Sequence, residues 1–193
     1  MLNLLNLNSV MSRTVPFFLL TAFSPSIQGG NPAAVVFLDL NVPADTLAEI
    51  ARNLNQPITA FLSPTPLRPT SDKVVDFNVR WFTPVCEAPL CGHGTLAAAR
   101  AIFERPDLVT DSVEVVQLHT LTSGVVKARK VEGGFFEIQL PAGNQAEVSP
   151  DEKVKFMEML SNAFGREVAV NYIGKGSDSF DHCTTLRPWM GYC

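Results

Sequence analysis

The residues best suited to chemistry lie between Arg80 and Ala99. Within this stretch the thiol of Cys91 and the imidazole of His93 stand two positions apart, at the start of a helical pattern. An imidazole takes up or releases a proton near neutral pH. A thiol beside a helix N-terminus is expected to have a lowered pKa. The segment therefore predicts acid–base chemistry, with Cys91 and His93 as the candidate catalytic residues.

The same turn offers backbone donors to a ligand. Four N–H groups open the helical pattern, those of Gly92, His93, Gly94 and Thr95. The aligned peptide dipoles place about half a positive charge at such an end, which suits an anion. Because glycine has no side chain, a ligand can approach this backbone closely. We therefore expect Gly92, Gly94 and Thr95 to bind the carboxylate of a small substrate.

Three other interpretations of these residues stay open. The Gly-His-Gly turn can serve only as a helix cap, and Cys91 can be a small buried packing residue. A metal site built from Cys86, Cys91 and His93 is the third, but it lacks a fourth ligand and the paired spacing typical of zinc sites. The spacing of these residues therefore predicts no metal site.

Runs of apolar and β-branched residues predict a strand-rich lobe. Each run is rich in Val, Phe, Ile or Thr and is bounded by Gly, Pro, Asn or Asp. The runs cover residues 15–22, 33–38, 59–63, 76–82, 113–119, 125–131 and 135–140. Gly133-Gly134 predicts a hairpin turn between the last two. A further strand is expected from about Val168 to Ile173.

Helical periodicity predicts three helices, at about 45–54, from His93 or Gly94 to Glu104, and at about 151–164. Thr46 and Glu49 have the spacing of a capping box for the first. The first two turns of the second helix carry almost no charge, so we expect sheet around most of it. The pattern predicts an α+β lobe in which a curved mixed sheet wraps a central helix.

The chain divides into three predicted parts. Residues 1–13 are expected to be an N-terminal extension, although the apolar run from Val15 to Phe23 also has features of a short signal-peptide core. Residues 14–141 form the predicted lobe. Residues 142–193 are interpreted as a linker and the truncated start of a second lobe, with an irregular tail after Asp181.

The amino-acid composition limits the classes of partner that the chain can bind. The 193 residues carry a net charge of −4, with 46% hydrophobic and 18% charged residues. No basic cluster suits nucleic acid or an anionic membrane, and no apolar run approaches the roughly 20 residues of a membrane span. Four cysteines are too sparse for a disulfide scaffold. We therefore expect a cytoplasmic protein with a small-molecule or protein partner.

Two linked motifs resemble the phenazine-biosynthesis (PhzF-like) isomerase family. One is Gly30-Asn31-Pro32-Ala33-Ala34-Val35-Val36. The other joins Arg80-Trp81-Phe82-Thr83-Pro84 to Leu90-Cys91-Gly92-His93-Gly94-Thr95-Leu96-Ala97. The resemblance covers about residues 14–180 and implies a diaminopimelate-epimerase-like fold of two lobes with the active site between them. It also implies a cofactor-independent isomerase or epimerase that moves a proton on a small carboxylate-bearing metabolite.

The resemblance also carries over site residues. Cys91 stands where epimerases of this fold have a catalytic thiol, and Asn31 where the fold uses an asparagine at the substrate site. In the PhzF-like branch a glutamate moves the proton, but Ile58 occupies its position here. An isoleucine cannot exchange a proton, and acid–base help is typically worth about 10²–10⁴-fold in rate.

Three hypotheses about activity follow. The chain is an active isomerase that relies on Cys91 or His93, or it is an inactive relative that binds a metabolite or a protein. The third is an incomplete gene product without a function of its own. A truncated second lobe would also leave an apolar face exposed, which favours aggregation or a homodimer.

Overall fold

The computed structural model of the chain describes residues 14–26, 28–39, 41–65, 71–140, 145–176 and 183–186. The chain forms two compact units, residues Met1–Pro141 and Ala142–Cys193, and each is described here by itself. The predicted extension over residues 1–13 lies outside the described residues.

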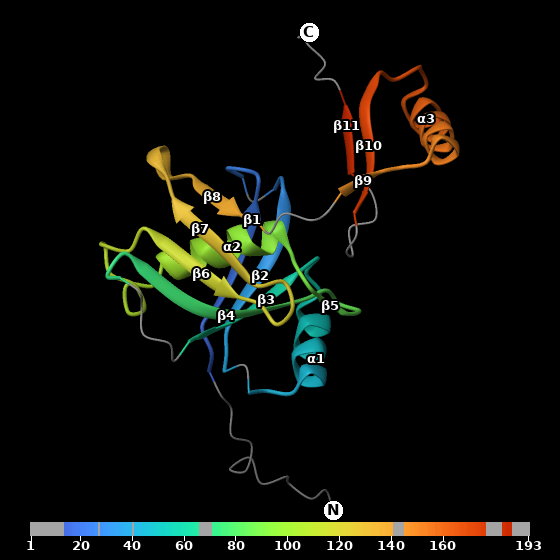
Figure 1. The fold of residues 1–193 in the computed structure, drawn as a ribbon. Coiled ribbons are helices and arrows are strands. Elements are labelled where there is room, and N and C mark those ends of the chain that lie inside the picture. Colours follow the sequence, from blue (N-terminus) through green and yellow to red (C-terminus); the bar gives the residue numbers. More distant parts are fainter. Residues whose placement is uncertain are drawn as a thin grey trace, which may run out of the picture. The chain divides into compact units, whose positions relative to one another are not determined.

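The first unit is built on a curled mixed sheet of eight strands (Figure 1). Along the sheet the strands are β1 (Phe17–Ala22), β2 (Asn31–Phe37), β3 (Thr59–Pro64), β4 (Val74–Phe82), β6 (Val115–His119), β7 (Val125–Lys130) and β8 (Phe136–Gln139). The short β5 (Glu87–Ala88) pairs with the end of β4. Neighbours β2–β3 and β4–β6 are parallel, whereas the other pairs are antiparallel.

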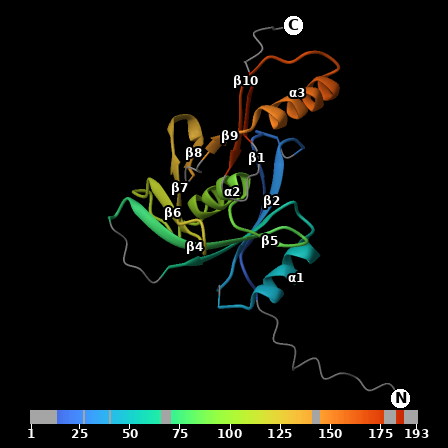
Figure 2. The ribbon, with the colours of Figure 1, turned by 45° about the vertical axis from the view of Figure 1, so that its right-hand side comes forward.

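Two helices cover opposite faces of this sheet. Helix α2 (Gly92–Phe103) lies in the hollow of the sheet and contacts β1, β2, β3, β6, β7 and β8 (Figure 2). Helix α1 (Ala44–Leu54) contacts β3 and β4 from the other side. The α+β class and the curved mixed sheet around a central helix are thus confirmed.

Alternation along the strands explains why both faces are buried. Successive side chains of a strand point to opposite faces, and on β4 Trp81 packs toward α2 while Phe82 packs toward α1. On β2, Val35 likewise packs toward α2 and Val36 toward α1. Most of α2 is buried, and its buried residues are mainly small. Small side chains let the helix approach the sheet closely, which places its first turn directly on β4.

The turn between β7 and β8 confirms the predicted hairpin. Gly133 and Gly134 lie in a 3₁₀ turn (Glu132–Gly134), and each has a φ of 77°. This left-handed conformation favours glycine, since it costs other residues steric strain. Lys130 and Phe136 pair across the turn.

The second unit contains β9 (Gln145–Glu147), α3 (Pro150–Phe164), β10 (Val170–Gly176) and β11 (Cys183–Leu186). Its three strands pair antiparallel in the order β11-β10-β9. The expectation of an irregular tail after Asp181 is wrong for Cys183–Leu186, because these residues pair with β10. The predicted linker likewise contains β9, which is too short to show a period.

The helix caps differ from the prediction. Helix α1 begins at Ala44, and Pro43 precedes it without a side-chain cap, so Thr46 and Glu49 form no capping box. A complete capping box instead joins Ser149 and Glu152 at the start of α3.

Candidate active site

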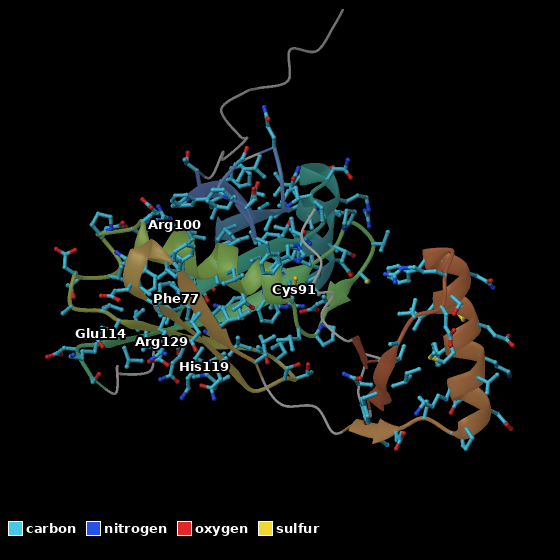
Figure 3. The ribbon with its side chains drawn as sticks, turned by 90° about the horizontal axis from the view of Figure 1, so that it is seen from above. Phe77, Cys91, Arg100, Glu114, His119 and Arg129 are labelled. Carbon is cyan, nitrogen blue, oxygen red and sulfur yellow. The ribbon has the colours of Figure 1, made fainter. Side chains whose placement is uncertain are left out.

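The candidate site lies where the chain passes from β4 into α2. Cys91 is the N-cap of α2 and has an extended backbone, with φ of −146° and ψ of 111°. Its Sγ accepts a hydrogen bond from the Gly94 N–H at 3.4 Å. Figure 3 shows Cys91 at the start of the helix, with Arg100 in its last turn. The thiol thereby takes the position that a serine or aspartate oxygen occupies in an ordinary N-cap.

Cys91 and His93 form a thiol–imidazole pair, in which Sγ and Nδ1 are 3.4 Å apart. Among the described residues, His93 Nε2 is buried and has no hydrogen-bond partner. Since Sγ already accepts from Gly94, the thiol proton is best used by donation to Nδ1. That arrangement favours the tautomer with the ring proton on Nε2. His93 then holds an unsatisfied N–H at the site.

Burial keeps both side chains of the pair uncharged at neutral pH. Desolvation raises the pKa of the Cys91 thiol above its usual 9.0, and the N–H groups of Gly94 and His93 oppose this effect without overcoming it. Desolvation also lowers the pKa of His93 below its usual 6.5. The predicted lowered pKa of the thiol is therefore wrong, because the helix-end effect is outweighed by the loss of water around the sulfur.

Three of the four backbone donors predicted to bind substrate, those of His93, Gly94 and Thr95, interact with Cys91. The Gly94 N–H donates to Sγ, and the Thr95 N–H donates to the Cys91 carbonyl at 2.9 Å. The Thr95 hydroxyl donates to the same carbonyl at 2.7 Å, and Thr95 is fully buried. A substrate-binding role for Thr95 does not fit this placement. Thr95 instead fixes the backbone of the residue that carries the thiol.

Gly94 makes room for Trp81, a residue that the site prediction omitted. A Cβ at Gly94 would lie 2.8 Å from Cδ1 and 3.1 Å from Nε1 of the Trp81 indole, and 3.2 Å from Cys91 Sγ. Trp81 is 1% exposed. The indole edge therefore supports the first turn of α2 directly below the thiol. The signal in the sequence was a large aromatic residue ten positions before Cys91, in the first part of the same motif.

The other predicted site residues occupy different environments. Gly92 faces the end of β8, and a Cβ there would lie 3.9 Å from the terminal methyl groups of Ile138 and Leu140. Asn31 is exposed at the first position of β2. Ile58 is 2% exposed and belongs to the hydrophobic core that covers α2. The structure thus brings Cys91, His93 and Gly92 together and places Ile58 inside the core.

Gly30, which precedes Asn31, has a conformation that only glycine tolerates well. Its φ is 73°, and a Cβ would lie 2.2 Å from the Ala22 carbonyl oxygen. This close approach sets the turn that leads from β1 into Asn31.

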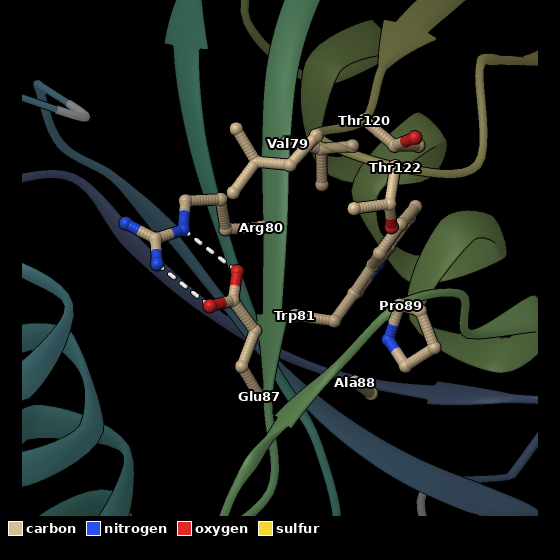
Figure 4. A pocket seen from close by; sticks show the side chains of 9 residues that line it. Val79, Arg80, Trp81, Glu87, Ala88, Pro89, Thr120 and Thr122 are labelled. Carbon is tan, nitrogen blue, oxygen red and sulfur yellow. Dashed lines mark hydrogen bonds and ion pairs between the residues drawn. The ribbon is translucent and has the colours of Figure 1, made fainter.

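Glu87 is the carboxylate nearest to the motif in sequence, but it is already engaged. Arg80 donates to both of its oxygens, from Nε and from a terminal nitrogen, each at 2.7 Å. The pair lines a cavity of about 230 Å³, and Figure 4 shows Arg80 and Trp81 on opposite sides of β4. Because Trp81 faces α2, the carboxylate of Glu87 lies away from Cys91 and His93.

Comparison with known proteins identifies the family. The family model described as "Phenazine biosynthesis-like protein" (PhzC-PhzF) matches residues 20–179, which include both motifs and the whole of the candidate site. The chain belongs to this family. A phenazine biosynthesis-like domain-containing protein of Rattus norvegicus is 40% identical over 123 residues, which are 63% of this chain and 41% of the rat protein.

Other relatives of this PhzF-like chain support the same family. A protein of Halalkalibacterium halodurans named as an uncharacterized isomerase is 32% identical over 143 residues, 73% of this chain and 49% of that protein. The crystal structure of a phenazine biosynthesis protein of the PhzF family from Enterococcus faecalis has a TM-score of 0.61 at 25% identity. That match covers 90% of this chain and 57% of the other. The fold is diaminopimelate-epimerase-like, and the chain spans about half the length of its relatives.

Neither a membrane-spanning helix nor a cluster of metal ligands occurs among the described residues. No helix among them has the length and hydropathy needed to cross a bilayer. Over the same residues, no three His, Cys, Asp or Glu side chains come together as metal ligands would.

Proposed function

We propose that this PhzF-like chain is an isomerase that moves a proton on a small carboxylate-bearing metabolite in the cytoplasm, using its own side chains. The observation that carries the proposal is the Cys91–His93 pair, with Nδ1 on the thiol and Nε2 unsatisfied at the N-terminus of α2. The isomerase named among its relatives supports the reaction class. No cofactor is needed, since the atoms that exchange protons belong to the chain.

The pair suits a two-atom proton relay. When Nε2 gives its proton to the substrate, Nδ1 takes the thiol proton and the imidazole stays neutral. The thiolate that remains is stabilised by the N–H groups of Gly94 and His93. In the return step Nε2 removes a proton from another substrate atom and Nδ1 returns one to the sulfur. One proton leaves the protein and one comes back, so the substrate is isomerised without net change.

The N-terminus of α2 is the proposed binding site of the substrate carboxylate. The dipole of this 12-residue helix favours an anion at Gly92, which has no side chain of its own. We propose Asn31 as a further polar contact, supported by its exposure and by the turn at Gly30 that directs the chain into it.

A second candidate function is binding without turnover. It is favoured by Ile58, which fills with a buried alkyl side chain the position where the resemblance places a glutamate. In that case the same helix end holds a metabolite or a protein carboxylate, and the Cys91–His93 pair serves as a hydrogen-bond donor. Neither the isomerase function nor the binding function is specific to phenazine biosynthesis.

Solvent exchange separates the two candidates. The 193-residue chain is incubated in D₂O with a panel of amino acids and cyclic dienoic acids, and deuterium on carbon is measured by mass spectrometry. Isomerase activity predicts exchange with at least one acid. His93→Asn should lower its rate by about 10²-fold or more, since acid–base help is of that size. Glu49→Gln, at an exposed residue of helix α1, is the matched control and should leave the rate unchanged.

The binding function predicts a different pattern. Acids would raise the unfolding temperature of the chain without exchange, and His93→Asn would weaken that shift. Ile58→Glu would then gain exchange if the missing glutamate alone silences the site. Ile58→Gln controls for burying a polar side chain in the core. Exchange that survives His93→Asn at full rate would contradict the proposed relay.

A further inference from the structure

The indole of Trp81 holds a buried N–H group that lacks an acceptor. Trp81 is 1% exposed, and no residue in the described part of the chain accepts a hydrogen bond from its Nε1. Burial costs such a donor its hydrogen bonds to water, and a buried Trp side chain usually finds a partner instead. The first unit therefore contains an unused indole donor within its core.

This unused donor lies next to the thiol of Cys91. The point where a Cβ of residue 94 would stand is 3.1 Å from Nε1 of Trp81 and 3.2 Å from Sγ of Cys91. Because residue 94 is a glycine, no side chain of that residue separates the two atoms. The Cδ1 of the indole is 2.8 Å from the same point, so the edge that carries Nε1 faces the first turn of α2. The indole nitrogen and the sulfur are therefore neighbours across Gly94.

The sulfur of Cys91 needs additional donors when it is ionised. In the proposed relay the thiol gives its proton to Nδ1 of His93, which leaves a thiolate. Burial removes water from this sulfur, and the N–H groups of Gly94 and His93 compensate for that loss only in part. Hydrogen bonds to the charged form of a group stabilise that form. An indole N–H beside the sulfur is suited to add to the two backbone donors.

Two other acceptors around the indole are already engaged. Trp81 lines the cavity of about 230 Å³ together with Thr120 and Glu87 (Figure 4). The Thr120 hydroxyl accepts a hydrogen bond from the Ser123 N–H at 2.8 Å. The Glu87 carboxylate accepts two hydrogen bonds from Arg80, each at 2.7 Å. The sulfur across Gly94 is the acceptor that the relay itself supplies.

We propose that Trp81 is a positioning residue whose indole N–H stabilises the thiolate of Cys91 during the relay. This role rests on the proposed function, because the thiol ionises in that relay. The indole donates a hydrogen bond and keeps its proton, so the proton balance of the relay is unchanged. The neutral thiol has little use for a third donor, which explains the unpartnered Nε1 in the resting pair. Once the sulfur is charged, the attraction is strengthened because little water screens it.

The test removes the indole N–H without changing the shape of the ring. The full chain with Trp189→Phe is the reference protein, so that Trp81 is the single remaining tryptophan. Growth on benzothienylalanine then exchanges Trp81 for an isostere that has sulfur in place of N–H. Carbon-13 NMR of the Cys91 β-carbon measures the pKa of the thiol without any substrate. The isostere should raise this pKa by about 1, which is about tenfold less thiolate at a given pH.

A second readout follows the indole itself. In the reference protein the N–H signal of Trp81 should shift as Cys91 ionises, with the same midpoint as the β-carbon signal. In Cys91→Ala the N–H signal should stay constant over that pH range. Circular dichroism establishes that the isostere protein is folded. If the isostere prevents folding, the titration of the indole signal still decides the question in the unmodified ring.

The outcomes separate this role from the proposed function. Equal thiol pKa values in the isostere and reference proteins would overturn the role of Trp81, and so would an indole signal that ignores the ionisation of Cys91. A raised thiol pKa in a chain that exchanges deuterium into no acid would support the contact and contradict the isomerase function. Exchange by the reference protein with an unchanged thiol pKa in the isostere would do the reverse.

Discussion

At the start of α2, the thiol of Cys91 and the imidazole of His93 are uncharged partners rather than an ion pair. Burial raises the pKa of the thiol and lowers the pKa of the imidazole, so neither shift favours the thiolate–imidazolium form. In the proposed mechanism this neutral pair exchanges protons with a ligand at one position, the buried and unsatisfied Nε2, while the sulfur supplies the second proton. The chemistry of the site therefore depends on the orientation of one ring.

The first residue-scale prediction concerns stability against pH. Because the folded pKa of His93 lies below 6.5, the unfolded chain binds more protons as pH falls below that value, and the free energy of unfolding decreases. Because the folded pKa of Cys91 lies above 9.0, the unfolded chain loses its proton first as pH rises, and stability falls again. Urea unfolding across this range should show the maximum between the two limits.

Matched variants test which residue causes the loss of stability below the maximum (the acid limb) and above it (the alkaline limb). His93→Asn should flatten the acid limb relative to the wild type and leave the alkaline limb in place. Cys91→Ala should do the reverse. An unchanged acid limb in His93→Asn would show that the imidazole is not desolvated in the folded chain.

The second prediction concerns the contact between Gly94 and Trp81. Gly94→Ala should destabilise the chain by about 1–3 kcal/mol, since the new Cβ overpacks against the indole at 2.8 Å. Gly92→Ala is the control, because its Cβ meets only methyl groups at 3.9 Å, and should change stability by less than about 0.5 kcal/mol. Chemical unfolding measures both. Equal effects of the two substitutions would contradict the supporting role of Trp81.

At the scale of elements, periodicity and turn residues predicted the three helices and the longer strands. The pattern of α2 located its start to within about two residues, because few charges mark a helix buried in a sheet. Strands β5 and β9 escaped prediction, since two or three residues show no period. The helix caps were predicted wrongly. Thr46 and Glu49 have the spacing of a capping box, but α1 starts two residues before Thr46. The capping box of Ser149 at the start of α3 was not predicted.

Helix capping gives a prediction at this scale. Ser149→Ala removes the hydroxyl that accepts from Glu152 N–H and should destabilise the second unit by about 1 kcal/mol. Thr46→Ala alters an exposed threonine of α1 that makes no cap, and should be neutral within about 0.5 kcal/mol. Urea unfolding followed by circular dichroism compares them. A larger loss for Thr46→Ala would contradict the cap assignment.

At the scale of the whole molecule, the first unit holds a complete core of its own. Both hydrophobic clusters, around α2 and around α1, are made by residues of that unit. The burial of Ile58 was beyond the reach of the sequence, because it depends on contacts between segments far apart in the chain. The hydrogen bonds of Thr95 to the Cys91 carbonyl are local, but the sequence pattern does not show that they occupy its donors. The motif itself was predictable, since its chemistry lies within a few consecutive residues.

This organisation predicts that residues 14–141 fold by themselves. The isolated segment should unfold cooperatively, with a midpoint within a few degrees of that of the full chain, when Trp189 is replaced by Phe in the full chain and both are followed by near-ultraviolet circular dichroism of Trp81. A broad transition in the segment, beside a sharp one in the full chain, would contradict the independence of the first core.

In the proposed mechanism His93 offers a protonated Nε2, backed by the Cys91 thiol, to a carboxylate at the N-terminus of α2. Nitrogen-15 NMR of the imidazole in the full chain is the sharpest test, because the two ring nitrogens have different shifts in each tautomer. We expect a neutral ring protonated on Nε2 at neutral pH, with an Nε2 signal that moves when a small carboxylate is added and a ring that changes tautomer balance in Cys91→Ala. A charged ring, or an Nε2 signal that ignores every carboxylate, would contradict it.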